Sequence, residues 1–221
     1  MPIDPKRNLI FIHIPRTAGT SIEAMLGMRE TSKLHNVGPI PGLTSIKSPQ
    51  HLSYCELREI VEPNRFNKSY KFAFVRNPWD RLVSEYHWRL RRVARSPRSK
   101  FLYALKSLES FEAFVDCAIN ADESCRYDAI FGFDGHLESQ VSYVADENGS
   151  VGLDFIGRFE TYREDVDRLC LKLQLGEISI PHTNRTDHGP YQSYYSAHAR
   201  RQVSRLYEED IERFNYCFGR E

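Results

Sequence analysis

The stretch HIPRTAGTS, residues 13–21, directly follows the apolar run LIFI, residues 9–12. A short apolar run rich in β-branched residues is typical of a buried strand. We expect this strand to cover residues 9–14 and a helix to follow at about residues 20–26. A loop between such a strand and helix lies at the carboxyl end of the strand, where backbone N–H groups and the helix dipole favour an anion. The stretch therefore predicts an anion-binding loop.

The side chains of this loop add hydroxyl donors and one permanent positive charge. The candidate residues are Arg16, Thr17, Ala18, Gly19, Thr20 and Ser21. Small residues let a ligand approach the backbone, and a guanidinium presents a forked set of donors. The alternative is an ordinary helix capped by Thr17 or Thr20 beside an exposed arginine. The motif GxxxxGK[ST] is absent and no expected strand ends in an aspartate that would hold Mg²⁺, which argues against a nucleotide kinase or hydrolase.

Strands alternate with helices along the rest of the chain. Residues 70–75 and 153–159 are also short, apolar and rich in β-branched and aromatic residues, as buried parallel strands are. We expect helices at these positions: near 53–61, after residue 75, in parts of 100–145, at about 162–173, and at about 196–207 with a continuation to 214. This alternation predicts a single α/β domain over residues 1–221, with a central, mostly parallel sheet flanked by helices and a P-loop-like nucleotide-binding core.

The composition excludes several classes of protein. Lysine plus arginine (30) equals aspartate plus glutamate (30), so charge gives no argument for a nucleic-acid partner. No apolar run approaches the roughly 20 residues that span a bilayer, and no charged-then-apolar leader begins the chain. We therefore expect a complete, cytoplasmic protein, with a lumenal Golgi location only if an anchor has been removed. The five cysteines are scattered and favour buried free thiols, although a Cys117–Cys125 disulfide stays open.

A second candidate anion site lies in FAFVRNPWDRLVSEYHW, residues 72–88. Arg76 follows the expected strand, and Asn77 is a good N-cap for the helix that starts at Pro78. Ser84 lies two turns along that helix, with its side chain leaning back toward the N-terminus. Two loop–helix anion sites on one sheet suit a ligand that carries two separate acidic groups.

These two motifs resemble the sulfotransferases that use 3′-phosphoadenosine 5′-phosphosulfate (PAPS). They are closest to the carbohydrate sulfotransferases that include heparan sulfate 2-O-sulfotransferase and bacterial relatives. The family reads PKTAGTS and RNPxxRLxSxY where this chain reads PRTAGTS and RNPWDRLVSEY. The resemblance implies that residues 16–21 hold the 5′-phosphosulfate and that Arg76 and Ser84 bind the 3′-phosphate. It also implies adenosine 3′,5′-bisphosphate as the product, and transfer without a metal.

The resemblance continues to the C-terminus and has one notable departure. DFIGRFETYREDVDRL, PHTNRTDHGPYQSYYS and LYEEDIERFNY match later family segments, so it covers nearly the whole chain. It implies that the loop 184–191 closes over the cofactor, with Arg185 as a phosphate contact. The departure is Arg16, where the family has lysine. Because arginine is a poor proton donor, we assign Arg16 an electrostatic catalytic role.

Sulfuryl transfer to an alcohol is aided by a base with a pKa near neutral, and eight histidines are candidates. QHLSYCEL, residues 50–57, resembles the family's HVSY segment, so we expect His51 to be the catalytic base; a capping contact near a helix N-terminus is the alternative. Glu85 and His87 are interpreted as ordinary helix residues. His182 and His188, with Asp187, lack a further ligand at a recognisable spacing, so we expect no metal site.

The acceptor is expected to be a hydroxyl compound, a saccharide by resemblance. A run of six basic residues between Arg89 and Lys100 is either a solvated helix face or a track for an acidic polysaccharide. Trp88, Tyr191, Tyr194 and Tyr195 are either sugar-stacking or core residues. Segments 30–50 and 90–150 are the expected acceptor-facing regions, because specificity usually resides in loops. A non-catalytic nucleotide- or glycan-binding protein is the remaining alternative; the oligomeric state is left open.

Overall fold

The computed structural model describes residues 3–28, 50–95, 108–120, 135–175 and 189–219. Contacts divide the chain into two compact units. The first, called the sheet unit, comprises Met1–Arg76 and Gln140–Asn184. The second, called the helical unit, comprises Asn77–Ser139 and Arg185–Glu221. The expectation of one domain over residues 1–221 stays a prediction.

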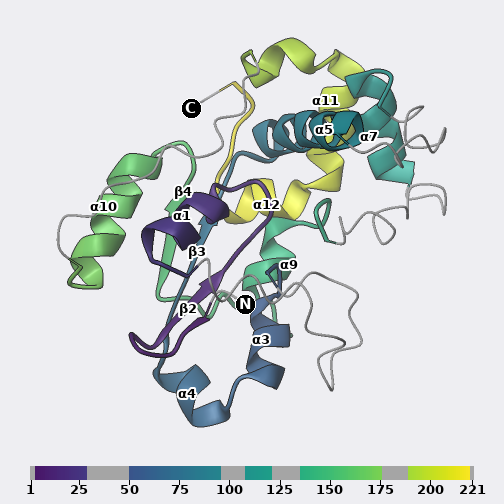
Figure 1. The fold of residues 1–221 in the computed structure, drawn as a ribbon. Coiled ribbons are helices and arrows are strands. Elements are labelled where there is room, and N and C mark those ends of the chain that lie inside the picture. Colours follow the sequence, from purple (N-terminus) through teal and green to yellow (C-terminus); the bar gives the residue numbers. More distant parts are fainter. Residues whose placement is uncertain (1–2, 29–49, 96–107, 121–134, 176–188, 220–221) are drawn as a thin grey trace. The chain divides into compact units, whose positions relative to one another are not determined.

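The sheet unit is built on a sheet with the strand order β1-β2-β3-β4. The strands are β1 (Ile3–Asp4), β2 (Leu9–Ile12), β3 (Tyr70–Val75) and β4 (Phe155–Arg158). β2 pairs parallel with β3, and β3 pairs parallel with β4, while β1 adds an antiparallel edge to β2. Figure 1 shows β2, β3 and β4 running together through this unit. The predicted mostly parallel α/β fold is confirmed.

One face of the sheet packs against α1 (Gly19–Met25) and α10 (Tyr162–Lys172). Phe72 and Phe74 alternate with Lys71 and Ala73 along β3, so they share this face. They form one buried core with residues of β2, β4 and both helices, including Phe11, Ile22, Phe155, Val166 and Leu169. This burial of aromatic and aliphatic side chains is the main stabilising term of the unit.

The sheet unit also contains α3 (Tyr54–Ile60), α4 (Pro63–Lys68) and α9 (Gln140–Val144). Ser53 caps α3 in a capping box with Glu56, since each side chain binds the other's backbone N–H. Pro63 is the first residue of α4, where its missing N–H costs nothing. The Lys71 ammonium lies 5.0 Å from the centre of the Phe66 ring of α4. Lys71 therefore packs against α4 with its charged end over an aromatic face.

The helical unit contains α5 (Pro78–Arg95), α7 (Phe111–Asn120), a 3₁₀ turn η4 (Tyr191–Tyr194), α11 (Ala197–Leu206) and α12 (Glu208–Arg213). Tyr86 of α5 packs its ring against Phe111 and Phe114 of α7. Two side-chain hydrogen bonds join α7 to α11 and its cap, Ser196 to Glu112 at 2.7 Å and Gln202 to Asp116 at 3.0 Å. The long α5 is therefore covered on its apolar face by α7.

Several expected elements differ in their bounds. The strand expected at 9–14 ends at Ile12, because the chain turns after it and Ile14 N–H donates to the Ile12 carbonyl at 3.2 Å. The strand expected at 153–159 covers only Phe155–Arg158. The last predicted helix breaks at Tyr207 into α11 and α12. Ala94, expected on the buried face of α5, is exposed. Helices expected around Phe101 and Leu105 lie outside the described residues.

Among the described residues, no helix is both long and apolar enough to cross a membrane.

Candidate functional site

The predicted anion loop lies at the carboxyl edge of the sheet, between β2 and α1. Arg16 and Ala18 both have positive φ, 68° and 67°, which is unusual for residues with a Cβ. The Thr17 hydroxyl donates to the Ile14 carbonyl at 2.9 Å, and this hydrogen bond within the loop stabilises its turn. Thr17 and Ser21 are buried, whereas Arg16, Ala18 and Thr20 are partly exposed. The loop is thus a tight turn whose charged side chain and one hydroxyl face outward at least in part.

Gly19 packs closely against His13. A Cβ on Gly19 would lie 2.0 Å from Cδ2 and 2.1 Å from Nε2 of His13. The missing side chain therefore makes room for the His13 imidazole. This packing places a histidine edge directly against the first residue of α1, while the approach of a ligand to Gly19 stays a prediction.

His13 belongs to a buried cluster around Glu23 of α1. Nδ1 of His13 lies 2.8 Å from Glu23 Oε1, and Nε2 of Gln50 donates to Glu23 Oε2 at 2.9 Å. Glu23 is only 1% exposed and His13 4%. A buried carboxylate needs partners for both oxygens, and here both are bonded. Glu23 therefore ties residues 13 and 50 to the same helix.

The catalytic-base candidate His51 lies next to this cluster. Its Nδ1 donates to the backbone carbonyl of His13 at 2.8 Å, because a carbonyl oxygen can only accept. The rings of His51 and His13 meet edge to face with their centres 4.6 Å apart. In the neutral His51 ring this tautomer makes Nε2 the basic nitrogen. The N-cap of α3 is Ser53, two residues after His51.

Arg76, the second predicted phosphate ligand, is the last residue of the first segment of the sheet unit. Its guanidinium lies 3.8 Å from the centre of the Phe159 ring, and its Nη1 donates to the Arg16 carbonyl at 3.1 Å. The parallel register of β2 and β3 explains this meeting, since both strands deliver their carboxyl ends to the same edge. The structure therefore brings Arg16, Arg76 and the loop between β2 and α1 together.

The backbone of Arg76 is held by Gln140 of α9. The Arg76 N–H donates to Gln140 Oε1 at 2.8 Å, and Gln140 Nε2 donates to the Arg76 carbonyl at 2.8 Å. Gln140 is fully buried. The side-chain amide thus satisfies both backbone groups of the first residue beyond the strand.

The remaining predicted site residues lie in the helical unit or outside the described residues. Ser84 is buried in α5 and belongs to the helical unit, so its place beside Arg76 in a phosphate site stays a prediction. The cap of α5 is as expected: Asn77 Oδ1 accepts from Trp79 N–H at 3.1 Å. Arg185, the histidines His182 and His188, and all of the expected acceptor-facing segment 30–50 except Gln50 lie outside the described residues.

Glu85 proves to be more than an ordinary helix residue. Its carboxylate accepts from Arg89 Nε at 2.8 Å and faces His136 Nδ1 at 3.1 Å, with all three side chains largely buried. The His136 ring stacks on Trp88, with centres 4.9 Å apart. Arg89 of the predicted basic run is therefore paired with an acid of its own helix and is not part of a free cationic track.

The tyrosines considered for sugar stacking take part in aromatic packing inside the helical unit. Phe111 meets Tyr194 and Tyr195, and Phe218 meets Tyr191 and Tyr195. The interpretation as core residues therefore accounts for these rings.

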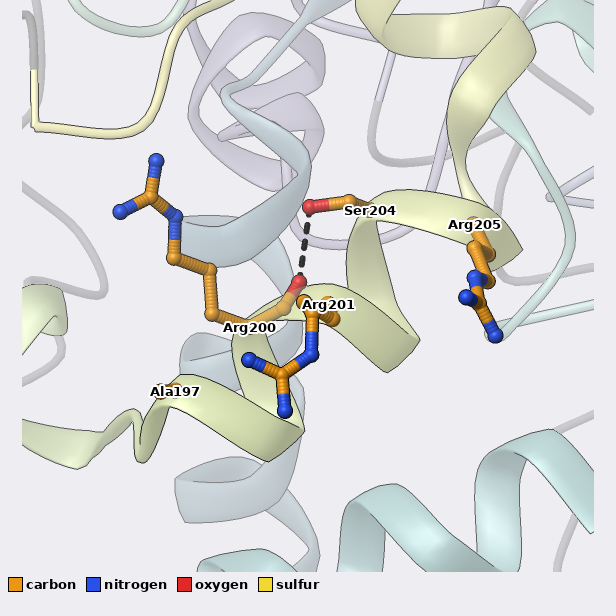
Figure 2. Close-up of a pocket in the computed structure, with 5 residues that line it drawn as sticks. All are labelled: Ala197, Arg200, Arg201, Ser204 and Arg205. Carbon is orange, nitrogen blue, oxygen red and sulfur yellow. Dashed lines mark hydrogen bonds between the residues drawn. The ribbon is translucent and has the colours of Figure 1, made fainter.

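A hollow of about 440 Å³ lies along α11 in the helical unit. Figure 2 shows its lining residues: Ala197, Arg200, Arg201, Ser204 and Arg205. The Ser204 hydroxyl donates to the Arg200 carbonyl at 2.7 Å, and the Arg200 guanidinium lies 4.4 Å from the Phe218 ring centre. Three acidic residues follow in the first turn of α12. The hollow contains none of the predicted site residues.

Cysteines and metal ligands add little to the site. In the described part of the chain, no three histidine, cysteine, aspartate or glutamate residues are arranged to hold a metal. Cys55 and Cys170 are free and partly buried, whereas Cys217 is free and exposed, against the expectation of buried thiols. Cys117 is disulfide-bonded, which the sequence left open, and Cys125 lies outside the described residues.

A strand–loop–helix turn at the carboxyl edge of a parallel sheet, with the guanidinium of Arg76 bonded to its backbone, is typical of α/β proteins that bind phosphorylated ligands. The family model of the sulfotransferase family matches residues 1–217. The chain therefore belongs to the sulfotransferase family, and it is a transferase of that class.

Sequence reasoning missed three residues that shape this site. Glu23 and Gln50 organise the histidine cluster, and Gln140 holds Arg76. Glu23 directly follows the apolar Ile22 in the short helix 19–25, and an acid at such a position could have indicated a buried carboxylate with partners. Gln140 is 64 positions from Arg76 and has no such local signal.

Proposed function

We propose that this sulfotransferase takes the sulfuryl group from PAPS and transfers it to a hydroxyl group of a saccharide by in-line displacement. The donor supplies an activated sulfuryl group joined to a phosphate leaving group, so the protein's task is positioning and neutralisation of charge. The products are a sulfated saccharide and adenosine 3′,5′-bisphosphate.

The observation that carries the proposal is the convergence of Arg16 and Arg76. Arg76 Nη1 donates to the Arg16 carbonyl at 3.1 Å, so one residue of the second candidate motif contacts the first candidate loop. A donor with phosphate groups at both ends of its ribose fits two neighbouring arginines, because each guanidinium forms charge-assisted hydrogen bonds. Adenosine phosphates without a 3′-phosphate would use only one of them.

Within this proposal each residue has a defined task. Arg16 faces the bridging region of the phosphosulfate and stabilises the negative charge that develops on the leaving group. The backbone of Ala18 and Gly19, and the hydroxyls of Thr20 and Ser21, complete the contacts to the 5′-phosphosulfate. Arg76 and Ser84 bind the 3′-phosphate, and Arg185 adds a phosphate contact.

His51 is the proposed base for the acceptor hydroxyl. Its Nδ1–H is committed to the His13 carbonyl at 2.8 Å, which favours a basic Nε2 in the neutral ring. That bond also orients the ring relative to β2. A base oriented in this way takes up the acceptor proton as the sulfuryl group moves.

The experiment is a transfer assay with PAPS that carries a radioactive sulfuryl group. The protein is incubated with a panel of neutral, uronic-acid-containing and sulfated oligosaccharides, and label is followed into saccharide and into sulfate. Label in a saccharide, dependent on His51, supports the proposal. Release of phosphate from ATP with Mg²⁺, and no transfer of label, would support a kinase or hydrolase. Binding of nucleotide with no transfer to any acceptor would support a non-catalytic binding protein.

A further inference from the structure

Arg76 directly follows the last residue of β3, at the point where the pairing of the sheet ends. β3 ends at Val75, whose partner on β4 is Arg158, and the Val75 carbonyl accepts from Phe159 N–H at 2.8 Å. Arg76 is therefore the first residue whose backbone N–H and C=O have no strand to pair with. A buried backbone pair left unbonded would be costly.

The side-chain amide of Gln140 forms the two backbone hydrogen bonds that a neighbouring strand would form with Arg76. Its amide oxygen accepts from Arg76 N–H and its amide nitrogen donates to the Arg76 carbonyl, both at 2.8 Å. A side-chain amide offers an acceptor and a donor at this spacing, whereas an ionised carboxylate lacks the donor and an apolar chain lacks both. Gln140 has 0% exposure, so water does not substitute for either bond.

Holding both backbone groups fixes the direction in which the Arg76 side chain leaves the chain. The guanidinium then lies on the Phe159 ring at 3.8 Å and reaches the Arg16 carbonyl at 3.1 Å. If the peptide groups on either side of Arg76 could rotate, a small change at the backbone would be magnified along the long side chain. Orientation errors of about 1 Å are enough to weaken a binding constellation.

We propose that Gln140 is a positioning residue that sets recognition of the nucleotide 3′-phosphate through Arg76. This inference rests on the proposed function, in which Arg76 binds that phosphate. Gln140 lies inside the segment 90–150 that the sequence assigned to the acceptor, so the proposal gives part of that segment a role on the donor side.

The test compares two nucleotides by calorimetry, adenosine 3′,5′-bisphosphate and adenosine 5′-monophosphate. Their affinity ratio isolates the contribution of the 3′-phosphate. We expect Gln140→Met, which keeps the length but removes both bonds, to lower this ratio at least about tenfold, the effect of losing a charge-assisted contact. Affinity for the monophosphate should change less than about threefold. Gln140→Glu keeps the acceptor and loses the donor, and should lower the ratio by an intermediate amount.

The Gln140→Glu variant offers a rescue that a merely structural role would not show. A protonated glutamic acid carries an O–H that can donate to the Arg76 carbonyl. Relative to the wild-type chain at the same pH, its affinity ratio should therefore recover as the pH falls from about 8 to about 6, because burial favours the neutral form.

Asp165 provides a matched control at the end of the neighbouring strand. Its Oδ2 accepts from Arg158 N–H and from the Thr161 hydroxyl, both at 2.8 Å. Asp165→Asn should lower the unfolding temperature while keeping the wild-type affinity ratio.

The outcomes separate this inference from the proposed function. A wild-type chain with no preference for the bisphosphate would contradict the proposed function. A wild-type preference that Gln140→Met or Gln140→Glu retains in full would overturn the role of Gln140 alone. Failure of both variants to fold would show Gln140 to be a structural residue and would also overturn it.

Discussion

The guanidinium of Arg76 donates to the backbone carbonyl of Arg16 at 3.1 Å, which links two stretches of sequence 60 residues apart. Both residues follow strands that run parallel, and the pairing of Ile12 with Ala73 puts the ends of the strands at one edge. The link therefore follows from the topology of the sheet. Both motifs therefore contribute an arginine at this edge of the sheet, Arg16 from the first and Arg76 from the second.

Arg76→Lys should weaken binding of adenosine 3′,5′-bisphosphate by at least about tenfold and leave adenosine 5′-monophosphate nearly unaffected. Lysine keeps the charge but loses both the forked donors and the flat contact with Phe159, which lies 3.8 Å from the guanidinium. Calorimetry measures both affinities. Arg58→Lys is the control, because Arg58 forms an exposed ion pair with Glu147. An unchanged bisphosphate affinity in Arg76→Lys would remove this residue from the site.

His51→Asn should lower the turnover number by about 10² to 10⁴, the usual contribution of a general base, while nucleotide affinity stays within about twofold. Asparagine can still donate to the His13 carbonyl, so the local bonding at 2.8 Å has a replacement. Initial rates of sulfuryl transfer and a parallel nucleotide titration measure the two effects. The exposed His198 on α11, changed to Ala, serves as the control. Normal turnover in His51→Asn would exclude it as the base.

Arg16→Lys should keep the turnover number within about tenfold of the wild type, whereas Arg16→Met should lose at least about 10². Lysine retains the positive charge opposite the leaving group, and methionine retains only the length of the chain. The positive φ of 68° at this position strains all three residues alike, so the comparison isolates charge. Equal rates in the lysine and methionine variants would mean that Arg16 does not stabilise the leaving group.

Gly19→Ala should lower the free energy of unfolding by about 1–3 kcal/mol, the typical cost of overpacking. The new Cβ would lie 2.0 Å from Cδ2 of His13, so the imidazole or the loop must move. Urea denaturation gives the change. Gly189→Ala is the matched control, since nothing lies within 4 Å of its Cβ position. Adding His13→Ala to Gly19→Ala should recover part of the loss, and equal stability of Gly19→Ala and the wild type would contradict this packing.

Tyr162→Phe should reduce the loss of stability at alkaline pH. Burial raises the pKa of Tyr162 from 10.0 to about 12, so the folded chain favours the protonated phenol. This contribution is fully present below about pH 10 and is lost as the pH rises toward 12. Urea denaturation of both proteins between about pH 9 and pH 11 measures the difference. Parallel curves for the two proteins would exclude Tyr162 as a source of the pH dependence.

The parts of the fold with a strong local pattern could be predicted from the sequence. Residues 70–75 form β3 as expected, because aromatic and β-branched residues bounded by polar ones define a buried strand. The N-cap Asn77 was predictable for the same local reason. By contrast, β1 has only two residues and exists through its pairing with Leu9 and Ile10, which no local pattern reveals.

The residues of the candidate site also divide into those with a local sequence signal and those without one. Arg16, His51 and Arg76 lie in motifs that stand out locally. In the structure Arg76 contacts the Arg16 carbonyl and His51 contacts the His13 carbonyl. Glu23 and Gln140 act through partners 10 and 64 positions away, so their importance appears only when the chain is folded. The packing of His13 against Gly19 is likewise visible only in the folded chain, and the approach of a ligand to Gly19 stays a prediction.

The most direct measurement of the central claim is a calorimetric titration of the wild-type chain with adenosine 3′,5′-bisphosphate, ADP, and ATP with Mg²⁺. We predict that the bisphosphate binds at least about tenfold more tightly than either of the others, because it alone presents a phosphate to both arginines. Tighter binding of ADP, or of ATP with Mg²⁺, would contradict the assignment of PAPS as the sulfuryl donor.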